Sequence, residues 1–101
     1  MKLNALKKIK RQLKEMEKSP QNRNYRDLVS LAKQLGRTED KRGKEPTYSR
    51  IRDPALSPPL SIPKHSGDLK TGTARSIIDA LLSDIDEWEI HLAEVGDENE
   101  G

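Results

Sequence analysis

Two side chains that can exchange protons, Glu45 and His65, each lie in a basic stretch of the chain. A carboxylate can accept a proton as a general base when a nearby imidazolium supplies the other proton, and surrounding cations can bind the phosphate on which such a pair would act. The candidate phosphate contacts are Lys41, Arg42, Lys44, Lys64, Lys70 and Arg75. These residue types favour binding of a phosphate-rich ligand, with acid–base chemistry as a further option.

Each candidate also has a simpler structural interpretation. Glu45 in a basic run suits a surface carboxylate in loose ion pairs, worth about 0–1 kcal/mol. His65, in a Lys-His-Ser-Gly turn, suits a solvent-facing histidine or one that fixes the loop by a hydrogen bond. His91 is expected on the surface of an acidic helix, and Trp88 in the core or an interface. Two histidines without an aligned carboxylate set form no metal motif, so no cofactor is expected.

The net charge reverses sign along the 101 residues, a length that allows one small domain. Residues 1–52 carry a net charge of +10, from 16 Lys and Arg against 6 Asp and Glu, whereas residues 76–101 contain 9 Asp and Glu and no Lys or Arg. The basic half can meet phosphates and the acidic end cannot. The alternative is that the two are solvated faces that attract each other within the fold.

An amphipathic helix is expected over residues 2–18, because apolar residues recur there at spacings of three and four. The apolar positions are Leu3, Leu6, Ile9, Leu13 and Met16, and the wet side carries Lys7, Lys8, Lys10, Arg11 and Lys14. A basic amphipathic helix can bind a membrane surface, nucleic acid or a partner helix. More often, such a stripe packs on its own domain or on a second subunit. Homo-oligomerisation through this helix is therefore one of the alternatives left open.

The chain contains no cysteine, which excludes disulfides and thiolate metal sites and makes the cytoplasm the simplest location. The N-terminal segment carries charges every few residues and no continuous apolar run. We therefore expect neither a signal peptide nor a membrane span, and no membrane partner.

A second helix and then short strands are expected in the centre of the chain. The helix covers the apolar positions from Tyr25 to Leu35, with Asn24 as its N-cap and Gly36 as its C-terminal stop. Strand candidates follow at residues 37–44, 45–52 and 60–63. The first of these contains no apolar residue, so it would be short, exposed and at an edge.

The stretch from Leu60 to Ile78 joins a strand, a turn and the start of the last helix without a gap. That helix carries the strongest apolar stripe in the chain, from Ala74 to Leu92, and acidic residues that include Asp84 are expected on its remaining, wet side. The order of helix, helix, strands and helix predicts an α+β fold with helices packed on one face of a small antiparallel sheet.

The segment IPKHSGDLKTGTARSII resembles the C-terminal half of the HicA-type toxins of bacterial toxin–antitoxin pairs. In that family a strand ending in proline, a polar loop, an Asp-Leu pair and a Gly-Thr pair recur together. They stand here as Ile62-Pro63, Lys64 to Gly67, Asp68-Leu69 and Gly72-Thr73. The resemblance covers roughly residues 24–85.

This resemblance implies a double-stranded-RNA-binding-domain-like (dsRBD-like) fold, with a three-stranded antiparallel sheet and both helices on one face. It also implies metal-independent cleavage of mRNA and neutralisation by a cognate HicB-like antitoxin. The corresponding domains are an extra N-terminal helix at residues 1–20, a HicA-like domain at 21–95 and a disordered tail at 96–101.

The family's catalytic motif is altered in this chain. The resemblance implies a catalytic histidine in a Gly-Ser-His-His type motif at the start of the second strand. In this chain, Glu45 and Pro46 stand at the two histidine positions. We interpret Glu45 and His65, from neighbouring strand ends, as a substitute pair. RNA would run between a basic edge over residues 37–44 and a basic loop over residues 64–70. The alternative is a catalytically inactive RNA-binding or protein-interaction module of the same fold.

Overall fold

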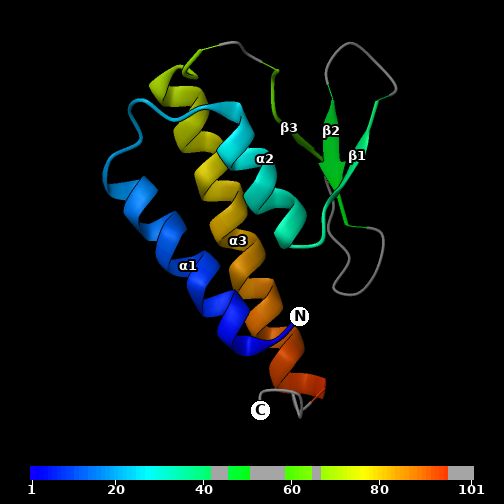
Figure 1. The fold of residues 1–101 in the computed structure, drawn as a ribbon. Coiled ribbons are helices and arrows are strands. Elements are labelled where there is room, and N and C mark those ends of the chain that lie inside the picture. Colours follow the sequence, from blue (N-terminus) through cyan, green and yellow to red (C-terminus); the bar gives the residue numbers. More distant parts are fainter. Residues whose placement is uncertain (42–45, 51–58, 65–66, 96–101) are drawn as a thin grey trace.

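The helical periodicities of the sequence correspond to three helices in the computed structural model, which describes residues 1–41, 46–50, 59–64 and 67–95 (Figure 1). The elements are α1 (Leu3–Lys18), α2 (Tyr25–Gln34), β1 (Thr38–Asp40), β2 (Thr47–Ser49), β3 (Leu60–Ser61) and α3 (Thr71–Val95). The α+β class is confirmed. The tail expected at residues 96–101 lies outside the described residues.

The three strands form one antiparallel sheet in the order β1-β2-β3, so β2 is central. Tyr48 lies directly opposite Glu39 on β1 and Leu60 on β3, and directly opposite residues share a face of a sheet. Tyr48 is buried in the core, so this face is the one that the helices cover. The strands are shorter than the expected ranges, and β3 ends before Pro63, which has no N–H for a ladder.

Helix α1 packs along α3, and Figure 1 shows α2 and α3 lying between α1 and the sheet. The apolar stripe of α1 is covered by other parts of the chain, and four of its side chains are at most 9% exposed. These residues are Leu6, Ile9, Leu13 and Met16. The stripe therefore packs on its own domain. None of the helices in the described parts of the chain is both long and apolar enough to cross a membrane.

Helix α2 begins and ends as its sequence predicts. The side chain of Asn24 accepts a hydrogen bond from the N–H of Asp27 at 2.9 Å, which satisfies one free donor of the first turn. At the other end, Gly36 has a φ of +94°. Its N–H donates to Lys33 O and the N–H of Arg37 donates to Ala32 O, each at 3.0 Å. This pair of bonds is a Schellman motif, and it turns the chain so that Arg37 enters the interior.

The start of α2 is fastened to the segment before α3. Asn24 forms an isolated antiparallel bridge with Asp68, and the N–H of Leu69 donates to Arg23 O at 2.8 Å. Leu69 is itself buried in the core. This clasp fixes the ends of the two helices that cover the sheet.

Candidate functional site

A groove of about 870 Å³ lies between one side of α2 and the β1–β2 end of the sheet. Its α2 wall comes from positions one turn apart, because residues 25, 26, 29, 30, 33 and 34 all line it. Glu39 and Lys41 line it from β1 and the residue after that strand, and Lys64 from the segment after β3. The groove is open to solvent, so an extended ligand can enter it.

Four cations line this groove: Arg26, Lys33, Lys41 and Lys64 (the groove cations). All four are exposed, and within the described residues none of them forms a salt bridge or a side-chain hydrogen bond. Among the described residues of the lining, Glu39 is the one acidic residue. Within the described part of the chain, the groove therefore has an excess of positive charge, which suits a ligand with several phosphates.

Two phenol groups, from Tyr25 and Tyr48, lie in the lining of the same groove. Burial raises the pKa of Tyr48, and the nearby carboxylate of Glu39 and the Tyr25 phenol raise it further. Like any tyrosine with a pKa of 10.0 or above, Tyr48 is protonated at neutral pH, and a protonated phenol can donate a hydrogen bond to an anionic oxygen.

The structure brings two of the predicted contacts together, because Lys41 and Lys64 line one groove although they are 23 positions apart in the sequence. Lys70 and Arg75 are exposed at the start of α3 and do not line it. The remaining predicted residues lie outside the described residues: Arg42, Lys44, Glu45 and His65.

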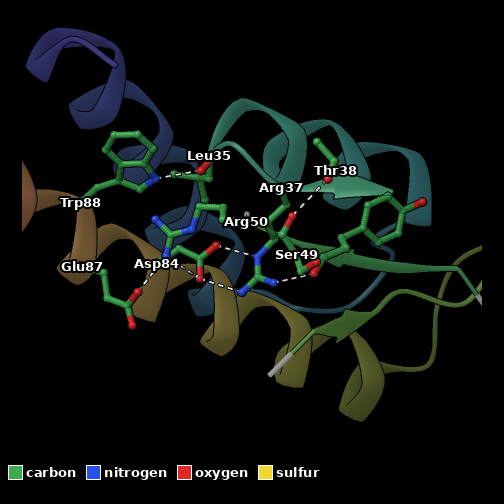
Figure 2. A network of polar contacts seen from close by, with 9 residues as sticks. Leu35, Arg37, Thr38, Ser49, Arg50, Asp84, Glu87 and Trp88 are labelled. Atoms are coloured by element: carbon green, nitrogen blue, oxygen red, sulfur yellow. Dashed lines mark hydrogen bonds and ion pairs between the residues drawn. The ribbon is translucent and has the colours of Figure 1, made fainter. Parts of the chain in front are cut away.

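A second group of charges, at the junction of the sheet with α3, is buried (Figure 2). Arg37 donates through Nε and Nη2 to the two carboxylate oxygens of Asp84, at 2.7 and 2.8 Å, and through Nη1 to Tyr48 O at 2.6 Å. Arg37 is 4% exposed and Asp84 is fully buried. The planar guanidinium thus matches the carboxylate with two parallel hydrogen bonds, which is the geometry that compensates best for desolvating both charges.

Arg50, directly after β2, extends this buried group toward Trp88. Its Nη2 donates to Glu87 Oε1 at 2.7 Å, and its guanidinium carbon lies 5.6 Å from the centre of the Trp88 ring. Nε and Nη1 of Arg50 are buried and have no hydrogen-bond partner within the described parts of the chain. Burial lowers the pKa of Arg50, and Asp84 and Glu87 oppose this shift. Trp88 Nε1 donates to Leu35 O at 2.7 Å, which links the group to the end of α2.

These contacts correct three expectations. Arg37 does not belong to an exposed basic edge, because its side chain is buried against α3. Asp84 is not on the wet side of α3. His91, expected on the surface, is partly buried, and its ring lies edge-on to Trp88 with 5.8 Å between centroids. Trp88 is in the core, as predicted.

The basic and acidic ends of the chain attract each other within the fold. Lys10 pairs with Glu89 at 3.0 Å, Arg37 with Asp84, and Arg50 with Glu87. Each pair joins residues 1–52 to residues 76–101. Attraction between the two ends of the chain is thus confirmed for these side chains, although Arg37, Arg50 and Asp84 are buried rather than solvated. Of the groove cations, Arg26, Lys33 and Lys41 belong to the basic half and take no part in these pairs.

Several groove residues were not predicted from the sequence as site residues. Arg26, Ser30 and Lys33 follow each other at spacings of four and three on α2, which places them on one face of that helix. This polar row was a usable signal. Glu39 carried no comparable signal, because its position depends on the pairing of two very short strands.

No protein-family model, curated protein or solved structure matches the chain. The likeness to HicA-type toxins therefore depends on the motif at residues 60–78 and on the order of the elements around it.

Proposed function

We propose that the chain is a HicA-like protein with a dsRBD-like domain that binds the phosphate backbone of RNA in the groove beside α2, and that a cognate HicB-like antitoxin holds it inactive. The observation that carries this proposal is that four exposed groove cations, which have no salt-bridge partner among the described residues, share one groove with two phenols. Backbone contacts of this kind recognise shape and charge rather than base sequence.

The order of elements supports the fold assignment. One helix, three antiparallel strands in sequential order and a final helix follow one another from α2 to α3. The helices lie on one side of the sheet (Figure 1). A dsRBD-like domain has the same succession and the same layering. Helix α1 is additional to it.

Cleavage is a separate part of the proposal. Lys41 and Pro46 line the groove and flank the segment that contains Glu45, and Lys64 directly precedes His65. Both proton-transfer candidates are therefore joined to residues of the groove wall. With Glu45 as base for the 2′-OH and His65 as acid for the leaving oxygen, the groove would cut the strand that it binds.

The test of binding compares two double variants that remove the same charge. Lys33→Gln with Lys64→Gln removes two groove cations, whereas Lys2→Gln with Lys8→Gln removes two exposed lysines outside the groove. Affinity for a fluorescent RNA duplex of about 16 base pairs, the length that such domains span, is measured at several salt concentrations. The groove variant should reduce the slope of log affinity against log salt by about 0.7–0.9 per lost contact. Equal slopes for the two variants would reject the groove as the binding site.

Cleavage is tested on a transcript with wild-type protein, Glu45→Gln and His65→Ala. The wild type is expected to cleave the transcript, and both variants are expected to leave it intact. An intact transcript with the wild type, together with salt-dependent binding, would leave the catalytically inactive RNA-binding module. Growth arrest on expression, relieved by the product of the neighbouring gene, is the expected sign of the toxin function.

A further inference from the structure

The outward face of α1 carries four cations on one line of the helix. Lys7, Arg11, Lys14 and Lys18 follow each other at spacings of four, three and four residues, and all are exposed. At 1.5 Å of rise per residue, this row (the α1 row) is ~16 Å long. Lys2 and Lys8 are also exposed but lie off the row.

The opposite, apolar face of α1 is not available for binding a membrane or a second helix. Its apolar side chains are buried against the rest of the chain, so they are not free to enter a lipid surface or to pair with a second helix. A membrane-surface helix needs such an apolar face. What α1 presents outward is charge, held in a fixed position by its packing along α3.

The fold itself makes little use of this charge. Lys10, which is not in the row, shows how a cation of α1 is neutralised internally, by Glu89 at 3.0 Å. Within the described residues, Lys14 has a loose pair with Glu17 at 3.7 Å, and Lys7, Arg11 and Lys18 have no acidic partner. Like charges at these spacings repel each other along a helix. An extended polyanion would relieve that repulsion along the whole row.

The α1 row and the groove are formed by different elements. Figure 1 shows α1 and the sheet separated by α2 and α3, whereas the groove runs between α2 and the sheet. A ligand that contacts both must therefore extend beyond the segment held in the groove.

We infer that the outward face of α1 is a second phosphate-contacting surface, which binds the RNA backbone beyond the segment held in the groove. This inference rests on the proposed function for the nature of the ligand. The charge complementarity and the length of the row carry it, since several successive phosphates of one strand can face a rigid line of cations. Helix α1 then extends the bound length of RNA without reading its sequence.

The test uses the full chain and two variants of α1 with equal net charge. Lys7→Gln with Arg11→Gln removes two cations of the row, and Lys2→Gln with Lys8→Gln removes two off the row. Both should melt like the wild type, because all four side chains are exposed. With an RNA duplex of about 32 base pairs, twice the span of a dsRBD-type domain, the row variant should lose about 0.7–0.9 of salt slope per cation, and the control should lose little.

The outcomes separate this inference from the proposed function. If the groove variant loses slope and the row variant matches its control, the second surface is rejected and the groove site stands. If the wild type does not bind RNA at low salt, both are rejected. The inference would also be overturned if the row bound anionic vesicles or an acidic partner protein while the row variant and its control had the same salt slope for RNA.

Discussion

The buried group at the junction of the sheet with α3 and the groove beside α2 both contain cations, but they use them in opposite ways. Arg37 and Arg50 are almost fully buried and are held by Asp84 and Glu87. The groove cations are exposed and have no partner within the described residues. The first set fixes α3 to the sheet, and the second leaves a surface of free charge. In this protein the partner of a basic residue, more than its type, decides whether its positive charge stabilises the fold or is available to a ligand.

The largest effect is expected where a buried charge loses its partner. Asp84→Ala leaves Arg37 without its carboxylate and should lower the free energy of unfolding by about 3–5 kcal/mol. Glu89→Ala, on the same helix, removes the half-exposed pair with Lys10 and should cost about 0–1 kcal/mol. Urea unfolding followed by circular dichroism measures both. Similar losses in the two variants would contradict the contrast between buried and exposed pairs.

A smaller effect is expected where the backbone carries Arg37 into the interior. Gly36→Ala places a methyl group at a φ of +94°, 3.4 Å from the Trp88 ring, and should cost about 1–2 kcal/mol. Gly72→Ala is the matched control, because nothing lies within 4 Å of the added carbon and the site is helical. It should gain up to about 1 kcal/mol. A neutral Gly36→Ala in thermal melts would show that the turn tolerates a side chain.

The smallest effect concerns Tyr48, which belongs to both regions because its carbonyl accepts from Arg37 and its side chain lines the groove. Its raised pKa means that the folded protein keeps this proton above pH 10.0, where an unfolded tyrosine loses it. Stability should therefore be intact below that pH and fall as pH rises above it. Tyr48→Phe should reduce this loss of stability at high pH. In an ultraviolet titration of the tyrosines, it should also remove the late step, which is the ionisation of Tyr48 above pH 10.0.

Glu39→Gln is the control for the electrostatic part of that shift. It removes the carboxylate opposite Tyr48 and should move the late step toward lower pH without abolishing it. Persistence of the late step in Tyr48→Phe would show that Tyr48 does not produce it.

The helices could be predicted from the sequence because their signals are local. The stripe of α1, the cap at Asn24 and the stop at Gly36 each depend on residues within one or two turns. The burial of Asp84 could not be predicted in the same way, since its partner Arg37 is 47 positions away. Leu81 and Trp88, three positions before Asp84 and four after it, did place it on the apolar face of α3, which was a missed signal.

The candidate site was predictable only in part, for the same reason. Basic residues at Lys41 and Lys64 indicated a phosphate contact, and the fold brings both to one groove. Helix α2 forms the facing wall of the groove because of how this helix packs against the sheet. Strands of two or three residues give no register in the sequence, so the position of Glu39 beside Tyr48 could not be derived.

The clasp between Asn24 and Asp68 has a consequence for the order in which the protein folds. It closes a loop of 44 residues, and the chain entropy lost in such a closure is about 3 kcal/mol. Strands this short cannot repay that loss alone, so we expect α2 and α3 to dock first through their apolar faces. The sheet then forms between ends that are already held, and the groove is the last part of the molecule to assemble.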